Sequence, residues 1–388
     1  MKQFLKNKFH EIYQKEPDKY FSCGGRFEVL GNHTDHNHGL CLAATCNLSI
    51  YAAVKKRDDL IVNIFSEGFG AFKLDLLTLE KVEEEKGKPS AFVRGICYYL
   101  SNIGLKYGGF DMYCKSEVPP GAGVSSSAAF ELLIATTIKK LFNKDDSCNL
   151  TSLCKAGQFA EMNYYGKVCG LLDQIGVAYG GLVYIDFEDI VNPDIKRIDA
   201  NLDGYQFVIV NSGGSHAGLD HLYAAIPQDM KSVARYFGKE VLRDVKKDLV
   251  IENKEDVIAK CGIRAYQRAM HFYDENDRVI AAYNLAVNKQ WNKLIELINE
   301  SRKSSTELLK NMCIDDKVDG SPLEACELIM KVSNNKAGVK INGGGFAGSV
   351  IALVPNNELD NVVKAAKEKY GNNNVHLVSI RNQTPSEL

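Results

Sequence analysis

The residues best suited to chemistry lie in the segment from Pro119 to Ala129, which reads PPGAGVSSSAA. A strand-like run precedes it and a helix-like run follows, so its small residues lie where a helix begins. A helix N-terminus offers free backbone N–H groups and partial positive charge, and glycines let that backbone approach an anion closely. Serine hydroxyls add further hydrogen-bond donors. The segment therefore predicts a loop that holds phosphates.

Two familiar phosphate-binding patterns do not fit this loop. A Walker loop requires GxxxxGK followed by Ser or Thr, and the segment has no lysine. A protein kinase requires HRD and DFG elements, which the chain lacks. The alternative is a purely structural interpretation, in which a serine caps the helix after a glycine turn and binds no ligand.

Two carboxylates further along the chain are expected in apolar surroundings. On a helix from about residue 150 to residue 165, Glu161 falls on the stripe that also carries Cys154 and Ala160. Asp173 lies in the apolar, glycine-containing run CGLLDQIGVAYGG. Because an unpaired buried carboxylate is costly, Glu161 is either a buried salt-bridge partner or a metal ligand. Asp173 is either a base or ligand, or an aspartate satisfied by backbone N–H groups.

Three further polar or glycine-rich features have less specific interpretations. The segment GNHTDHNHG (31–39) favours a polar turn that lines a pocket over a metal cluster, since its spacing matches no closed zinc site. Arg26 is either a surface arginine or a fixed cation near an anionic centre. The run GGGFAG (343–348) matches GxGxxG, but a strand-like run follows it where a dinucleotide site requires a helix. A tight turn between strands is therefore expected there.

Strand-like and helix-like segments alternate around these motifs, which predicts an α+β architecture with mixed sheets and helices packed on them. Two domains, 1–190 and 191–388, are expected, with the division in the polar stretch NPDIKRIDANLDG. The expected strands are 43–54, 110–118, 180–187, 205–210, 339–342, 349–354 and 375–380. The expected helices are 1–14, 128–142, 150–165, most of 224–327, and one from about residue 358.

Composition narrows the partners and the location. The net charge is −2, with 25% charged residues of mixed sign, which does not fit a nucleic-acid-binding face. No apolar run approaches the roughly 18 residues of a membrane span, and the N-terminus lacks a signal-peptide core. The 11 cysteines form no CxxC pair and suit reduced, buried thiols. We expect a cytoplasmic monomer or weak oligomer that binds a small molecule, not nucleic acid or membrane.

Three motifs, in this order, resemble those of the GHMP kinase superfamily and, within it, the galactokinases. GGRFEVLGNHTDHNHG resembles the galactokinase signature, VPPGAGVSSSAAFE the phosphate loop of the superfamily, and VKINGGGFAGSVIALVP its C-terminal glycine loop. The HTD tripeptide and the GLLDQ segment are similar to the galactokinase branch. The resemblance implies a two-domain kinase with ATP bound between the domains, Mg²⁺ as cofactor and the C1 hydroxyl of galactose as phosphate acceptor.

The resemblance also implies a role for each matching residue. Asp173 is the expected catalytic base and Arg26 its cationic partner, while Ser127 and Glu161 are expected to hold Mg²⁺. The residues expected around the ATP phosphates are Gly121, Ala122, Gly123, Val124, Ser125, Ser126 and Ser127. The residues expected around the sugar are Asn32, His33, Thr34, Asp35, Gly170, Asp173 and Tyr223.

The sequence departs from the galactokinase pattern at several positions. Asn32 replaces the usual Glu that contacts the C6 hydroxyl, His36 replaces Tyr, Cys23-Gly24 replaces Ala-Pro, and Ala347 replaces a common Gly. Exchanging a charged for a neutral hydrogen bond weakens galactose binding roughly tenfold. Galacturonate, arabinose or N-acetylgalactosamine are therefore alternative substrates. A sensor that binds sugar and ATP without catalysis is a second class of function, disfavoured because Asp173, Arg26, Glu161 and the three serines are all present.

Overall fold

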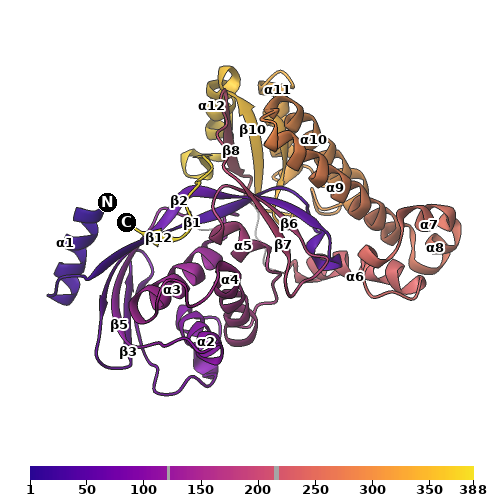
Figure 1. Cartoon of the computed structure of the whole chain (residues 1–388). Coiled ribbons are helices and arrows are strands. Elements are labelled where there is room, and N and C mark those ends of the chain that lie inside the picture. Colours follow the sequence, from indigo (N-terminus) through magenta and orange to yellow (C-terminus); the bar gives the residue numbers. More distant parts are fainter. Residues whose placement is uncertain (120–122, 214–217) are drawn as a thin grey trace.

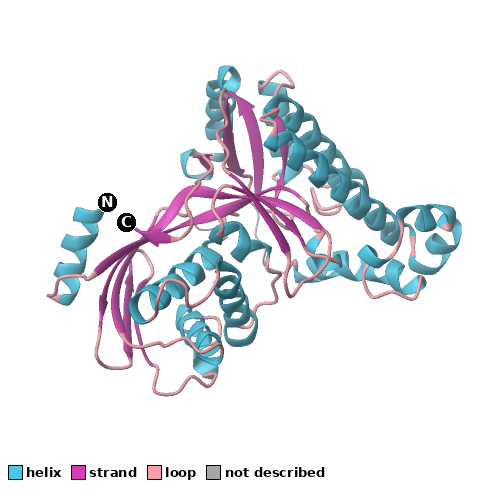
Figure 2. Cartoon of the chain, in the orientation of Figure 1, coloured by secondary structure: helices cyan, strands magenta, loops and turns pink. Residues whose placement is uncertain are grey.

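The structure, a computed structural model, describes residues 1–119, 123–213 and 218–388. Two β-sheets carry helices packed on their faces, as Figures 1 and 2 show. This is the mixed α+β architecture that the sequence predicts. In the part of the chain that the structure describes, no helix has the length and apolar character needed to cross a membrane.

The larger sheet has eight strands. They are β1 (Lys19–Leu30), β2 (Leu40–Lys56), β3 (Ile61–Ser66), β4 (Gly70–Asp75), β5 (Phe110–Ser116), β6 (Leu182–Asp186), β7 (Asp194–Ile198) and β12 (Ser386–Glu387). Their order is β12-β1-β2-β5-β3-β4, and β6 pairs with both β2 and β7. β2 pairs with β1 along most of its length, while its two ends pair with β6 and β5. β3 and β5 run parallel, so the sheet is mixed.

The smaller sheet has four antiparallel strands in the order β11-β8-β10-β9. They are β8 (Tyr205–Asn211), β9 (Gly338–Asn342), β10 (Ser349–Pro355) and β11 (Val375–Val378). β9 and β10 are joined by the glycine run 343–348, which confirms the predicted tight turn between two strands. We call residues 343–348 the glycine hairpin.

The helices of the first half of the chain surround the larger sheet. They are α1 (Lys2–Tyr13), α2 (Pro89–Asn102), α3 (Ser126–Phe142), α4 (Leu150–Phe159) and α5 (Leu172–Ala178). Helices α2 to α5 gather on one side of the sheet, and α1 lies on the other side, where it packs on the central strands β2 and β5 (Figure 1). The apolar side chains of α3 and α5 share one core with those of β1 and β2. These long strands are buried on both faces along most of their length.

The helices of the second half form two groups. They are α6 (Asp220–Tyr236), α7 (Lys247–Glu252), α8 (Lys254–Cys261), α9 (Ile263–Val287), α10 (Trp291–Ser304), α11 (Pro322–Val332) and α12 (Leu359–Tyr370). Helices α11 and α12 pack on the smaller sheet through Cys326 and Val362. Helices α6, α8 and α9 form a separate core through Met230, Val257 and Phe272. This arrangement confirms the helical stretch predicted between residues 224 and 327.

The expected strands and helices are present, with ends shifted by a few residues. The helix predicted from residue 150 to residue 165 is α4 followed by a π-helical turn, Ala160–Tyr165. Elements β1, β3, β4, β7, β12, α2 and α5 were not predicted. The division of the chain at residue 190 stays a prediction. The larger sheet extends beyond it to β7, and β12 at the end of the chain returns to pair with β1.

Candidate active site

The phosphate loop predicted from the sequence leads into α3, and its described part begins at Gly123. Gly123 (φ 72°) and Ser125 (φ 52°) have left-handed backbone conformations that turn the chain into the helix. A Cβ at position 123 would lie only 2.4 Å from the hydroxyl oxygen of Ser349, so space also requires glycine there. Ser126 and Ser127 begin the helix, where the first backbone N–H groups lack helical partners. Gly121 and Ala122 lie outside the described residues.

Ser125 connects this loop to the carboxylate of Asp173. It occupies the N-cap position of α3, but its hydroxyl donates to Asp173 Oδ2 (2.5 Å) and makes no cap bond to the helix backbone. The ordinary serine cap that the sequence left open is therefore not what Ser125 forms. Asp173 lies in the first turn of α5, with 33% of its side chain exposed.

Arg26, from β1, binds the same carboxylate. Its Nε and Nη2 lie 2.8 and 2.7 Å from Asp173 Oδ1, and its Nη1 donates to the carbonyl of Gly123 (2.7 Å). Burial acts to raise the pKa of Asp173, but the Arg26 guanidinium and the Ser125 hydroxyl outweigh it, so the pKa lies below its ordinary value. The carboxylate is thus ionised at neutral pH and linked to the phosphate loop through two residues.

Glu161 is buried, as the helical pattern predicts, and lies in the π-helical turn after α4. Its Oε2 accepts a hydrogen bond from Gln174 Nε2 (3.1 Å), and its Oε1 pairs with the ammonium of Lys167 (2.9 Å). The Ser127 hydroxyl oxygen lies 3.5 Å from the same Oε1. The salt bridge that the sequence left as an alternative is therefore present. The carboxylate also faces the first turn of α3.

The donor set at Ser127 and Glu161 fits a magnesium ion. Mg²⁺ prefers oxygen ligands, and in phosphate-transfer sites it binds through one or two carboxylates together with substrate phosphates and water. A hydroxyl and a carboxylate oxygen 3.5 Å apart are donors of this kind. Over residues 1–119, 123–213 and 218–388, no three His, Cys, Asp or Glu side chains gather into a metal site made by protein alone.

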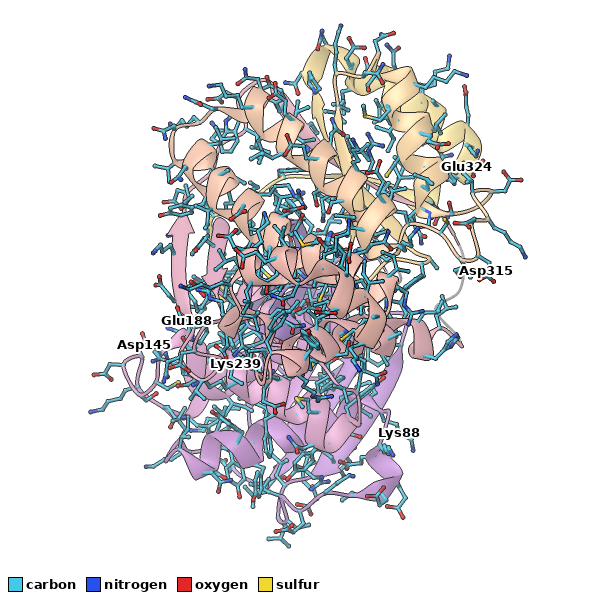
Figure 3. The ribbon with its side chains drawn as sticks, turned by 90° about the vertical axis from the view of Figure 1, so that its right-hand side faces the viewer. Lys88, Asp145, Glu188, Lys239, Asp315 and Glu324 are labelled. Carbon is cyan, nitrogen blue, oxygen red and sulfur yellow. The ribbon has the colours of Figure 1, made fainter. Side chains whose placement is uncertain are left out.

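A cavity of about 490 Å³ opens beside the start of α3. Its polar end carries Ser126, Ser127, Glu161 and Lys167. Most of the remaining wall is apolar and includes Phe69, Phe72, Phe92, Val118, Phe130 and Tyr165. The exposed Lys88 also lines it, and Figure 3 shows this residue in the lower part of the molecule, with Glu324 of α11 in the upper part. An apolar pocket that adjoins a phosphate loop suits a flat aromatic base.

The segment from Gly31 to Gly39 forms a compact polar turn between β1 and β2. The Thr34 hydroxyl lies within hydrogen-bond distance of the carbonyls of Gly31 (2.9 Å) and Leu40 (2.6 Å). Thr34 is fully buried, so its side chain closes the turn from inside. Glu275, from α9, accepts a hydrogen bond from the N–H of Gly31 (3.0 Å) and anchors the turn to that helix.

Asn32 is directed into a buried polar network. Its Nδ2 donates to Glu28 Oε1 (3.1 Å) and to the carbonyl of Gly343 (2.7 Å), and its Oδ1 accepts from Asn311 Nδ2 (2.8 Å). Lys340 pairs with the same Glu28 oxygen (2.8 Å). With 1% of its surface exposed, Asn32 links β1 to the glycine hairpin and presents almost no surface to a ligand.

His33 is buried and neutral. Its Nε2 lies 2.8 Å from the carbonyl of Gly344, which assigns the proton to Nε2 and leaves Nδ1 as an acceptor. Nδ1 is buried and has no hydrogen-bond partner among the described atoms. Burial lowers the pKa of His33 to about 3, so the ring carries no charge at neutral pH. The unsatisfied Nδ1 can accept a hydrogen bond from a hydroxyl.

Asp35 and Gly170 meet from the turn and from the loop before α5. A Cβ at position 170 would lie 2.5 Å from Asp35 Oδ2, so the Asp35 side chain can keep this conformation only while residue 170 is glycine. Asp173 follows three positions after Gly170 in the chain. The structure therefore places the Asp35 carboxylate at one end of the short segment 170–173 and the Asp173 carboxylate at the other.

Tyr223, from α6, packs on the glycine hairpin. Its hydroxyl donates to the carbonyl of Gly345 (2.8 Å), and its ring meets Phe346 edge to face at 5.5 Å. A Cβ on Gly344 would lie 2.6 Å from that ring, so the close packing requires glycine.

Several residues that hold the site together were not predicted. Lys340 and Glu28 form a buried ion pair, and Asn342 donates to the carbonyl of Gly123 (3.1 Å). The available signal was the presence of Glu28 in RFEVL and of Lys340 in VKIN, because a charge in a buried strand needs a partner. Glu275 had no comparable signal, since it lies in a long polar helix.

Comparison with known proteins places the chain in a family. The galactokinase galactose-binding signature matches residues 7–56, and the GHMP kinases N terminal domain matches residues 91–181. A galactokinase from Glaesserella parasuis serovar 5 (strain SH0165) is 30% identical over 349 residues, covering 89% of this chain and 88% of that protein.

Solved structures agree with this assignment. The structure of Lactococcus lactis galactokinase complexed with galactose matches with a TM-score of 0.84 and 25% identity, over 100% of this chain and 99% of that one. Methanococcus jannaschii mevalonate kinase, at 15% identity and a TM-score of 0.65 over 94% and 98% of the two chains, shows the shared fold. The chain therefore belongs to the galactokinase family of the GHMP kinases, and it is a sugar kinase with ATP as its phosphate donor.

Proposed function

We propose that this chain transfers the γ-phosphate of ATP to the C1 hydroxyl of galactose. One observation carries the proposal. The ionised carboxylate of Asp173 is bonded to Arg26 and Ser125 and lies between the phosphate loop and the Asp35–Gly170 contact. A base at this place can serve an acceptor hydroxyl on one side and a phosphoryl donor on the other.

We propose that ATP binds the loop and the cavity together. The adenine occupies the apolar part of the 490 Å³ cavity, and the phosphates lie along the loop from Gly121 to Ser127. The N–H groups at the start of α3 and the hydroxyls of Ser126 and Ser127 supply donors to the phosphate oxygens. ATP then lies where the phosphate loop meets Asn342 of the smaller sheet, close to the inter-domain position expected from the sequence.

Asp173 acts as the base. Its pKa is held below the ordinary value, so the carboxylate is unprotonated at neutral pH and available to accept the proton of the C1 hydroxyl. Arg26 holds Oδ1 and also offsets negative charge as the phosphoryl group transfers. Removal of such a preorganised donor costs about 10²–10³ in rate.

The sugar is bound by the polar turn and the loop before α5. Asp35 accepts hydrogen bonds from sugar hydroxyls, His33 offers its unsatisfied Nδ1, and Gly170 leaves room beside the Asp35 carboxylate. Tyr223 borders this region through the glycine hairpin. Asn32 and Thr34 are too buried to offer much surface to the sugar, so we propose that they hold the turn in shape.

Magnesium is assigned to Ser127 and Glu161. When bound, the ion supplies a charge that neutralises the phosphate oxygens of ATP. The observation that supports the assignment is the buried Glu161 carboxylate, whose Oε1 faces the Ser127 hydroxyl.

A sugar panel tests the proposal. Purified protein with Mg·ATP is given galactose, galacturonate, arabinose or N-acetylgalactosamine, ADP release is followed by a coupled assay, and the product is identified by NMR. We expect galactose 1-phosphate, with the highest kcat/KM for galactose. A large advantage for another sugar overturns the galactose assignment. Failure to transfer phosphate to any sugar favours the sensor alternative.

A further inference from the structure

Lys167 is held against Glu161 by its backbone and its side chain. The N–H groups of Gly166 and Lys167 both donate to the carbonyl of Glu161 (2.9 and 3.0 Å). Gly166 has a left-handed conformation (φ 93°), which ends the π-helical turn and returns the chain toward that residue. The Lys167 ammonium then lies 2.9 Å from Glu161 Oε1. π-Helical turns of this kind occur frequently at functional sites.

The two partners of this ion pair differ in exposure. The Glu161 side chain is 3% exposed, whereas that of Lys167 is 60% exposed. The lysine therefore reaches from the open cavity onto a buried carboxylate. Gln174 engages the other oxygen, Oε2. Lys167 thus occupies the carboxylate oxygen that faces the Ser127 hydroxyl, where a divalent cation is also expected.

The cavity places Lys167 within reach of phosphate. Its polar end is formed by Ser126, Ser127, Glu161 and Lys167 together. The phosphate loop has no lysine of its own, and Arg26 is engaged by Asp173 and by the Gly123 carbonyl. A lysine has a flexible stem and three donors, so it can follow a phosphate group without a fixed geometry. If the Lys167 ammonium moves from Glu161 to a phosphate and a metal cation takes its place, both the ammonium and the Glu161 carboxylate remain paired with an opposite charge.

We propose that Lys167 is a phosphate-binding residue that trades places with the divalent cation. In the free protein its ammonium neutralises Glu161. When a nucleoside di- or triphosphate enters with its metal, the ammonium moves to the phosphate oxygens and the metal takes its place on Glu161. The inference rests on the proposed binding of ATP and Mg²⁺ at this site, and it adds the cation that the loop lacks.

Calorimetry with ADP at a Mg²⁺ concentration that saturates the nucleotide-free protein tests the phosphate contact without turnover, because the cation then occupies Glu161 in every variant. We expect Lys167→Met to bind ADP about tenfold more weakly than the wild type, because a charge-assisted hydrogen bond is lost. Lys167→Arg, which keeps the charge, should recover most of the affinity. The matched control is Lys86→Met. The Lys86 stem lies beside Gly166, so this variant removes the same charge from the same neighbourhood without removing a cavity-lining residue.

Manganese binding to the nucleotide-free protein, followed by electron paramagnetic resonance, tests the exchange. Lys167→Met should bind Mn²⁺ at least about threefold more tightly than the wild type, because the metal no longer competes with an ammonium for Glu161. Lys167→Met leaves the buried Glu161 carboxylate without its cation, so its thermal unfolding midpoint should fall below that of the wild type, while that of Lys167→Arg should stay close to it.

The outcomes separate this inference from the proposed function. Equal ADP affinities for the wild type and Lys167→Met overturn the phosphate contact, as does an equal loss in Lys86→Met, which indicates a general charge effect. Unchanged or weaker Mn²⁺ binding by Lys167→Met overturns the exchange. Galactose phosphorylation by the wild type is measured separately. The proposed function can therefore be correct when the role of Lys167 is refuted, and the role of Lys167 can be correct when the proposed function is refuted.

Discussion

Replacement of Asp173 by asparagine changes one charge and almost no volume. The amide side chain keeps an oxygen that can accept from Arg26, whose Nε and Nη2 lie 2.8 and 2.7 Å from Oδ1 of the native carboxylate. The second oxygen, which accepts the Ser125 hydroxyl at 2.5 Å, becomes an amide nitrogen, and the hydroxyl rotates to accept instead. Asp173→Asn is therefore expected to keep the local packing while it removes the proton acceptor.

The expected effects follow from these contacts. Loss of the base lowers kcat by about 10²–10⁴. The buried Arg26 guanidinium then faces a neutral partner, which costs about 1–3 kcal/mol in unfolding free energy. ADP affinity should be unchanged or higher, because a negative charge near the phosphate loop is lost and Asp173 does not line the cavity.

Three measurements on the same preparation separate these effects: coupled detection of ADP for kcat, calorimetry for ADP binding, and urea unfolding. Asp35→Asn is the control, since it neutralises a second carboxylate of the proposed sugar site and should raise KM for galactose more than it lowers kcat. A folded Asp173→Asn protein that keeps kcat within about tenfold of the wild type refutes the assignment of Asp173 as the base.

Three further predictions concern the sugar site and its supports. Gly170→Ala should raise KM for galactose about tenfold with little change in kcat, because the new Cβ displaces the Asp35 carboxylate; an unchanged KM in steady-state kinetics would show that Asp35 is not a sugar ligand. Lys340→Met should lower the unfolding free energy by about 3–5 kcal/mol, because the Glu28 carboxylate is left buried without its cation. Urea unfolding measures this, and adding Glu28→Gln should restore most of the loss. For His33, the folded-state pKa of about 3 lies below the ordinary 6.5, so the neutral ring favours the folded state. The unfolding free energy should therefore fall as pH drops from 6.5 toward 3, by up to about 1.4 kcal/mol per pH unit, and this part of the slope should be absent in His33→Gln.

Strand β1 shows why local patterns missed a central element. Its sequence, KYFSCGGRFEVL, has two adjacent glycines and three charged residues, which interrupt the alternation typical of a strand. The glycines are required by close contacts made only in the fold. A Cβ on Gly24 would lie 2.4 Å from the Cys46 carbonyl oxygen, and one on Gly25 would lie 2.3 Å from that of Val124. These contacts let β1 pass beside β2 and the phosphate loop at once.

The helices were predicted well because their signals are local. The periodicity of α3, the small residues before it and the position of Glu161 on an apolar stripe lie within a few turns of chain. The expectation that Glu161 would be buried is confirmed. The periodicity of the helix does not predict the position of Lys167. It therefore could not show that Glu161 pairs with this lysine.

Residue types and their spacing were sufficient to predict a phosphate loop, two buried or partly buried carboxylates and the kinase family. They could not choose partners for the polar side chains. Arg26 meets Asp173 across 147 positions of sequence, and Asn32 meets Asn311 across 279. A buried polar group must be hydrogen-bonded, and its partner comes from whichever segment packs against it. The conformation of Asn32, directed toward Glu28 and the glycine hairpin, therefore follows from the packing of β1 against β9 and α9, and not from any pattern within the turn that carries it.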